Sequence, residues 1–234
     1  MYSAYPQHAG QTLNWLPMDT EVLYKRNIKN NYKELNDNGW IDNKVIYSFN
    51  QQGFRSPEFT DKPSAVFLGC SHTLGLGINI EDTFGYIVSK QLNLEYVNMS
   101  LASGSLDSVF RFCNNWLPKL QAKIIVLLVP TPERFEIIEG NTIKTITSNN
   151  IRETKYNTFY KNWISNNINL QLHQEKNLLA ITNLAQGTKV IKLEVANEFK
   201  KYNLDKARDL RHVGVKSHKK LSSDLIEKYI DKLN

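Results

Sequence analysis

The chain has 234 residues, of which 41% are hydrophobic and 22% charged, and a formal net charge of +6 at pH 7. This length suits one sizeable core and is short for two independent domains. Eleven tyrosines, ten phenylalanines and four tryptophans argue against a disordered chain. No run is long enough for a membrane helix, and residues 1–10 lack the layout of a signal peptide. We therefore expect a cytoplasmic protein that makes no membrane contact.

The two cysteines, Cys70 and Cys113, fall in segments that we expect to be buried. We interpret them as free thiols of a reducing compartment.

Basic residues gather near the end of the chain. A nucleic-acid surface would combine such a cluster with interleaved aromatic residues, and only Tyr202 is interleaved. We favour a solvated basic face and do not expect nucleic acid as a partner. A cluster that attracts an anionic substrate is the alternative. Its members are Lys200, Lys201, Lys206, Arg208, Arg211, Lys216, Lys219 and Lys220.

Residues 1–60 do not look like the start of a doubly wound sheet. Residues 1–17 are polar and aromatic without a period, which indicates an arm lying on the rest of the molecule. Apolar residues recur at a loose helical spacing over residues 20–35, which predicts a helix that ends at a turn-rich stretch.

Apolar and polar residues alternate over residues 44–49, and this alternation predicts a strand. The following turn, residues 50–53, could close a small hairpin onto Phe54 and Arg55. We interpret Arg55 as a structural ion-pair partner, with a substrate contact as the alternative.

The apolar run from Ala65 to Leu68 has the length and composition of a buried parallel strand. It ends in small and polar residues, and acidic residues then introduce a helix predicted over 81–92. Further strands are predicted over 95–99, 123–129 and 189–195, and helices over 106–120 and 154–182. A closing helix is predicted to have Leu221, Leu225, Tyr229 and Ile230 on one face.

This alternation predicts right-handed crossovers and a three-layer α/β/α sandwich with a central, mostly parallel sheet. Pro118 should kink or end the helix over 106–120 near its last turn. Residues 142–147 could form a short strand or a flap. An aromatic stripe at 156–164 is interpreted as core.

Two motifs lie at opposite ends of this pattern. Ser71 follows the first buried strand, at the sheet edge where open α/β proteins place their ligands. Asp209 stands three residues before His212, in a loop ahead of the last helix. A serine nucleophile needs an imidazole to take its proton, and that imidazole needs a carboxylate to fix its tautomer. One D-x-x-H loop can supply both.

The order Ser, Asp, His resembles the SGNH (GDSL-like) hydrolase family, over about residues 64 to 230. The family's first block matches Gly69-Cys70-Ser71, and its last block matches Asp209 to His212. The resemblance implies a flavodoxin-like sandwich over residues 61–234, with residues 1–60 as an extension packed on it.

Ser71 would be the nucleophile, His212 the general base and then acid, and Asp209 its orienting carboxylate. Cys70 is a rival nucleophile, but neighbours in an extended chain point in opposite directions, so only one can face the histidine. His72 is too close in sequence to reach back to Ser71, and we expect it beside the site or facing solvent.

Three other histidines lack a neighbouring carboxylate loop. His8 and His173 are predicted to lie on the surface, and His218 to be a capping or packing residue in the last helix.

The family also supplies donors to the oxyanion: the nucleophile's own N–H, a glycine N–H and an asparagine side chain. Ser71 and Gly104 can fill the first two places. The asparagine turn is missing, and Pro130 to Arg134 stands there instead. Thr131 or Arg134 could substitute for the asparagine. Arg134 would donate through its planar guanidinium group. Alternatively, Arg134 pairs with a neighbouring glutamate, Glu133 or Glu136, on the surface.

The resemblance implies a serine esterase or acetyl-esterase that acts on a small O-acyl ester through an acyl-serine intermediate. Carbohydrate esters are among the substrates of the family. No metal and no organic cofactor is expected. The alternative is an SGNH-fold protein with weak or no catalysis that binds as a subunit of a larger assembly.

Overall fold

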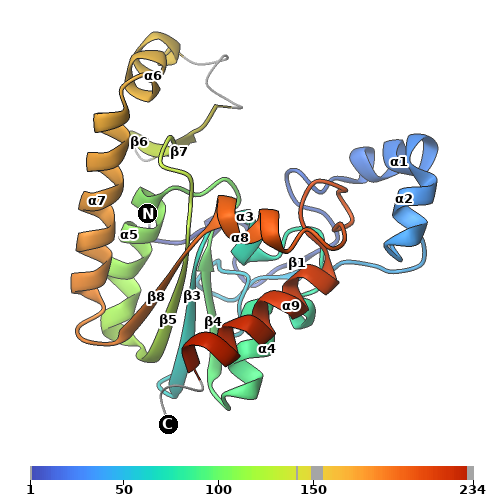
Figure 1. The fold of residues 1–234 in the computed structure, drawn as a ribbon, viewed down its shortest axis with the longest axis horizontal. Helices are drawn as coiled ribbons and strands as arrows, with labels where there is room; N and C mark the ends of the chain where they lie inside the picture. Colours follow the sequence, from blue (N-terminus) through green and yellow to red (C-terminus); the bar gives the residue numbers. More distant parts are fainter. Residues whose placement is uncertain (1, 141, 149–154, 231–234) are drawn as a thin grey trace.

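A computed structural model describes residues 2–140, 142–148 and 155–230 (Figure 1). Its central sheet has four parallel strands in the order β4-β3-β5-β8. In chain order these strands are second, first, third and fourth, as in flavodoxin-like doubly wound sheets. The predicted fold class is therefore confirmed. The strands are β3 (Pro63–Gly69), β4 (Glu95–Ser100), β5 (Gln121–Val129) and β8 (Lys189–Glu194).

Helices cover both faces of this sheet (Figure 1). Because successive side chains of a strand point to opposite faces, β3 contributes Val66 and Leu68 to one core and Ala65 and Phe67 to the other. The first core is closed by α5 (Leu106–Trp116) and α7 (Asn167–Leu184). The second is closed by α4 (Phe84–Gln91), α8 (Val195–Lys201) and α9 (Val215–Leu225), after which Ile226–Ile230 forms a π-helical turn.

Several helix predictions need correction. The helix predicted over 81–92 is a 3₁₀ turn, η2 (Ile80–Asp82), followed by α4. The helix over 106–120 gives way to a 3₁₀ turn, η3 (Leu117–Lys119), where Pro118 interrupts the backbone hydrogen bonds. Helix α8 was not predicted.

The helix predicted over 154–182 is two helices, α6 (Asn157–Ile164) and α7, and residue 154 itself lies outside the described residues. The chain breaks at Asn166, whose side-chain oxygen accepts the Ile168 N–H at 3.0 Å. A capping side chain of this kind begins a new helix instead of continuing the old one.

Residues 142–147 form a strand, the first of the two possibilities. β6 (Phe135–Glu139) and β7 (Thr142–Ile146) pair as an antiparallel hairpin that packs on α6. The aromatic stripe supplies buried Tyr160 to this small core, whereas Phe159 is 54% exposed.

The N-terminal segment, residues 2–60, holds a 3₁₀ turn, two short strands and two helices. The helix expected over 20–35 is broken at Asn31. The predicted hairpin is wrong: β2 pairs with β1, although the turn at 50–53 forms, with the Gly53 N–H donating to the Asn50 carbonyl at 2.9 Å. The elements are η1 (Pro6–His8), β1 (Thr12–Leu13), α1 (Glu21–Asn30), α2 (Tyr32–Asp37) and β2 (Tyr47–Ser48).

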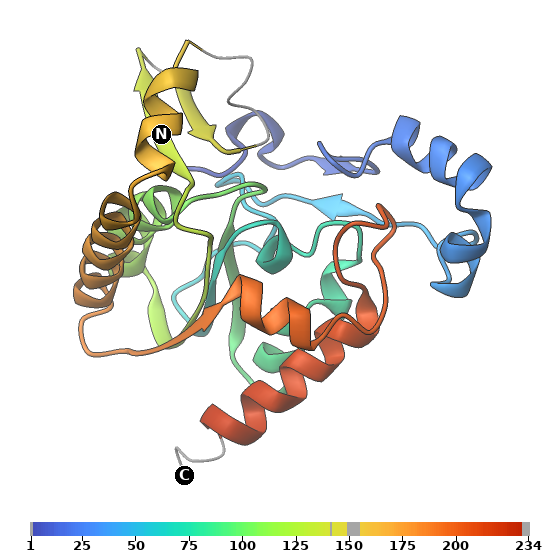
Figure 2. The ribbon, with the colours of Figure 1, turned by 45° about the horizontal axis from the view of Figure 1, so that its top comes forward.

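This segment lies against the sandwich beside the loop that precedes α9 (Figures 1 and 2). Tyr5 accepts the Ala102 N–H at 2.9 Å, and Trp40 donates its indole N–H to the Lys206 carbonyl at 2.7 Å. Arg55 is fully buried and donates to backbone carbonyls, and it forms no ion pair among the described residues, so the expected ion pair is not found there.

Among the helices that the structure describes, none combines the length and the apolar character required to cross a bilayer.

Candidate active site

The end of strand β3 sets the position of the serine. Gly69 has φ +152°, and a Cβ on it would lie 2.3 Å from Thr73 Oγ1 and 2.8 Å from the Leu128 carbonyl. Only glycine fits this close approach. The chain can therefore turn at once from β3 into a four-residue helix, α3 (Ser71–Leu74), which begins with Ser71 at the carboxyl edge of the sheet.

The structure brings Ser71, His212 and Asp209 into one hydrogen-bonded chain. His212 Nε2 lies 2.9 Å from Ser71 Oγ, and His212 Nδ1 lies 2.6 Å from Asp209 Oδ2. All three residues are buried. An ionised carboxylate at Nδ1 makes that nitrogen the protonated one, so Nε2 is left to accept the serine proton.

Asp209 also shapes its own loop. Its Oδ1 accepts the backbone N–H groups of Arg211 and His212, each at 3.0 Å. Burial alone would raise the pKa of Asp209, but hydrogen bonds from the His212 side chain and from these backbone groups outweigh it, and the pKa lies below its usual value. Asp209 is therefore ionised at neutral pH.

The residue after Asp209 has a conformation that side chains rarely adopt. Leu210 has φ +57°, in the left-handed region, which costs an L-residue roughly 1–2 kcal/mol. The surrounding contacts must hold it there.

The two neighbours of Ser71 point elsewhere. Cys70 is a free thiol buried in the core of the α4 face, as the alternation argument indicates. His72 packs its ring on Phe199, with ring centroids 4.2 Å apart, and against His212 at 4.9 Å. Burial first, and then electrostatic interactions with nearby basic groups such as Arg134, hold the pKa of His72 well below its usual value, so it stays neutral.

The other histidines include one correction. His218 accepts the Phe84 N–H at 3.1 Å and stacks on the Phe84 ring, so it caps α4, as predicted. His173 was predicted to lie on the surface but is buried, with its ring edge-on to Trp163. It sits on the face of α7 that turns toward the β6–β7 hairpin, which the sequence did not reveal.

The three oxyanion candidates differ in their availability. The Gly104 N–H already donates to the Leu101 carbonyl at 2.8 Å, and the Thr131 hydroxyl donates to Glu133 at 2.7 Å. Arg134 has a buried Nη1 that finds no hydrogen-bond partner among the described residues.

Neither glutamate considered for Arg134 forms an ion pair with it among the described residues. Glu136 instead pairs with Arg111 at 2.8 Å. After burial, the charge of Arg134 is among the smaller contributions to the lowered pKa of His72.

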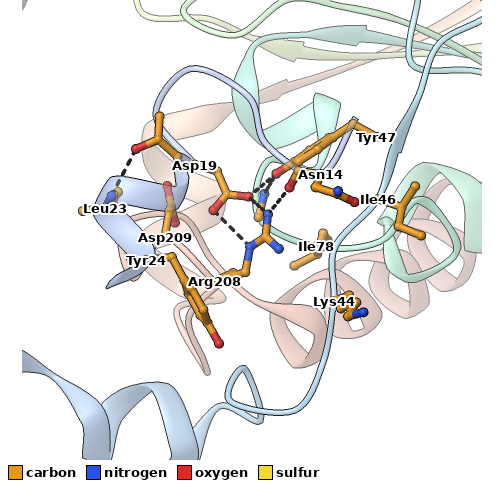
Figure 3. A network of polar contacts seen from close by, with 12 residues as sticks. Asn14, Asp19, Leu23, Tyr24, Lys44, Ile46, Tyr47, Ile78, Arg208 and Asp209 are labelled. Atoms are coloured by element: carbon orange, nitrogen blue, oxygen red, sulfur yellow. Dashed lines mark hydrogen bonds and ion pairs between the residues drawn. The ribbon is translucent and has the colours of Figure 1, made fainter. Parts of the chain in front are cut away.

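The sequence did not reveal a buried network next to Asp209. Asp19 lies between Arg208 and Tyr47, and it accepts hydrogen bonds from both (Figure 3). Arg208 was assigned to a solvated basic face, but it is buried. Its partner is 189 positions away, and no local pattern signals such a pair.

A cavity lies between the β6–β7 hairpin, α6 and α7. It has a volume of about 510 Å³ and is lined by aromatic rings and by His173, without contribution from Ser71, Asp209 or His212 in the described part of the chain. Among the described residues, no group of three or more His, Cys, Asp or Glu side chains is arranged to hold a metal ion.

The fold and this site define a three-layer α/β/α protein with a buried Ser–His–Asp chain at the carboxyl edge of its sheet. No protein-family model and no curated protein matches the chain. Several solved structures match part of the chain.

The structure of TesA matches with 12% identity and a TM-score of 0.46, over 70% of this chain and 96% of that one. A carbohydrate esterase matches with 15% identity and a TM-score of 0.39, over 76% and 65%. A G-D-S-L family protein of Desulfitobacterium hafniense DCB-2 matches with 14% identity and a TM-score of 0.38, over 68% and 95%.

Proposed function

We propose that the protein is a serine hydrolase that cleaves a small O-acyl ester. The observation that carries this proposal is the continuous contact from Ser71 Oγ to His212 and from His212 to Asp209, at 2.9 and 2.6 Å. Both distances are within hydrogen-bond reach, as nucleophilic catalysis by a serine requires.

In this mechanism, Ser71 Oγ attacks the carbonyl carbon of the ester while His212 Nε2 takes its proton. The tetrahedral intermediate collapses, the bond to the alcohol breaks, and His212 returns the proton to the leaving oxygen. Water then attacks the acyl-serine with His212 again as base, which releases the acid and restores the serine. Asp209 stabilises the imidazolium that forms in both steps.

The developing oxyanion needs hydrogen-bond donors. Ser71 is the first residue of α3, and the first N–H groups of a helix have no acceptor within the helix. We assign its N–H as one donor and Arg134 Nη1 as another, because that atom is buried and has no partner within residues 2–140, 142–148 and 155–230. The Gly104 N–H would join them only if it left the Leu101 carbonyl.

The substrate that we propose is a small acyl ester of an alcohol or a carbohydrate. The buried site and the neutral imidazole of His72 suit an uncharged acyl group. No cofactor enters the mechanism.

Labelling with a fluorophosphonate probe tests this function. We expect one adduct, mapped to Ser71, and its loss in the Ser71→Ala variant, together with turnover of an aryl acetate. A folded protein that remains unlabelled and inactive would contradict the proposal.

That outcome would favour the second candidate, a binding subunit without catalysis. The specific observation in its favour is the engaged Gly104 N–H, together with the missing asparagine turn.

A further inference from the structure

The N-terminal segment holds the loop that carries the proposed base, residues 205–214, which we call the base loop. The Trp40 indole N–H donates to the Lys206 carbonyl at 2.7 Å, and the Lys206 N–H donates to Asn38 Oδ1 at 2.8 Å. These contacts fix the beginning of the base loop to the end of α2.

A buried ion pair fixes the residue next to Asp209. Asp19 accepts from Arg208 Nε at 3.2 Å and from Nη2 at 2.8 Å, and Arg208 also donates to the Asn14 carbonyl at 2.7 Å (Figure 3). Both charged side chains are at most 4% exposed. A two-pronged contact of this kind fixes orientation as well as distance.

The same carboxylate reaches the segment that follows Ser71. The Tyr47 hydroxyl donates to Asp19 and accepts the Gly77 N–H at 2.8 Å. The Gly77 carbonyl in turn accepts the Arg208 N–H at 3.0 Å. A Cβ on Gly77, where φ is +80°, would lie 2.8 Å from the Ala207 side chain, so glycine permits this approach. Asp19 therefore connects the base loop to the segment that follows Ser71.

The base loop needs such support because Leu210 is held at φ +57°. A strained residue keeps its conformation only when its surroundings determine it. The Asn27 side chain adds a long contact, 3.5 Å, to the Asp209 carbonyl.

We propose that Asp19 is a positioning residue: through Arg208 and Tyr47 it sets the position of His212 relative to Ser71. This inference rests on the proposed function. It assigns residues 14–47, which lie outside the α/β sandwich, a direct part in the alignment of the site.

The test compares Asp19→Asn with Asp224→Asn. Asp224 is a matched control, because it is also buried, also accepts from a tyrosine, Tyr202, and pairs with lysines. Its partners lie outside the base loop. We expect Asp19→Asn to lower kcat for an aryl acetate by about tenfold or more, with KM within about threefold of the parent, since small misplacements cost chemistry more than binding.

A second readout does not require catalysis. The proton on His212 Nδ1, hydrogen-bonded to Asp209, should give a low-field signal in the proton NMR spectrum of the parent. We expect this signal to broaden or vanish in Asp19→Asn and to persist in Asp224→Asn. A signal and a kcat that are unchanged in Asp19→Asn, or equal losses in both variants, would overturn the proposal.

If Asp19→Asn does not fold, Tyr47→Phe replaces it, because that change removes the hydroxyl that joins Asp19 to the Gly77 N–H and keeps the ring. We expect a lower kcat with unchanged KM, and an unchanged kcat would count against the proposal. A parent protein with the low-field signal but without labelling or turnover would reject the proposed function, and the NMR comparison would still decide the role of Asp19.

Discussion

His212 Nε2 lies 2.9 Å from Ser71 Oγ, although the two residues are 141 positions apart. The contact forms because the carboxyl end of β3 and the loop before α9 meet at one edge of the sheet. Crossover connections return each strand to the same direction, so residues distant in sequence gather at that edge.

The first prediction concerns this contact. Ser71→Ala and His212→Ala should each abolish most turnover of an aryl acetate, and the double variant should cost little more than either, because residues that act as a unit are strongly non-additive. Steady-state kinetics measures all three. Cys70→Ala is the control and should retain turnover, since Cys70 packs into the core. A folded Ser71→Ala protein with parental rates would refute the nucleophile assignment.

The second prediction concerns Arg134, whose buried Nη1 has no partner in the part of the chain that the structure describes. If it donates to the oxyanion, Arg134→Ala should reduce kcat by about tenfold or more, since one lost donor costs about a hundred- to a thousandfold in well-defined cases. Fluorophosphonate labelling in that variant should still map to Ser71. A kcat within about threefold of the parent would exclude Arg134 as a donor and leave the Ser71 assignment intact.

The sequence predicts the parts of the fold that local patterns encode. The strand at Ala65–Leu68 and the motifs around Ser71 and His212 are short, continuous and chemically specific, so they could be recognised before the structure. By contrast, β1 and β2 have two residues each, and their pairing brings Thr12 to Ser48, which no periodicity signals.

The same reasoning explains what was missed at the site. The contact of Asp19 with Arg208 depends on where the N-terminal segment packs, and that packing is a property of the whole molecule. The Gly104 N–H could be predicted to lie near the site, but its hydrogen bond to Leu101 follows from a local turn with Ser103 at φ +60°.

The third prediction concerns acid stability. Burial lowers the pKa of His218 from 6.5 to about 3, so on acidification the unfolded chain takes up this proton before the folded one. The free energy of unfolding should therefore fall as the pH is lowered from about 6.5 toward 3, by up to about 1.4 kcal/mol per pH unit for this one group.

His218→Asn should keep an acceptor for the Phe84 N–H and remove this titration. Urea unfolding across that pH range should then give a shallower dependence, with a remaining slope from His72, whose pKa is also lowered. An identical pH dependence in parent and variant would contradict this prediction.

The fourth prediction concerns Arg55. It is fully buried and donates to the carbonyls of Leu74 and Gly75, at 3.0 and 2.7 Å, and to those of Ile46 and Ile78, at 2.9 and 2.8 Å. A lysine ammonium is compact and cannot span both pairs. Arg55→Lys should therefore lower the free energy of unfolding by on the order of 3 kcal/mol, since each buried carbonyl left without a hydrogen-bond donor costs about 1–3 kcal/mol.

Arg26→Lys on exposed α1 is the matched control, and we expect a change within about 0.5 kcal/mol, as for other surface substitutions. Denaturant unfolding measures both. Equal stability of the two variants would show that the Arg55 contacts contribute little.

The tie between Asp19 and Arg208 also bears on how the chain is synthesised. A chain is synthesised from its N-terminus, and a domain generally folds as a unit. Asp19, Tyr47 and Ser71 emerge early, but Arg208, Asp209 and His212 emerge only when nearly all of the other described residues have been made. A nascent chain can form most of its sheet before this point. The carboxylate of Asp19, however, cannot pair with Arg208 until Arg208 has been synthesised. Under the proposed function, the contact between Ser71 and His212 would therefore form as one of the last events of folding, and Ser71 would lack its base in the growing polypeptide.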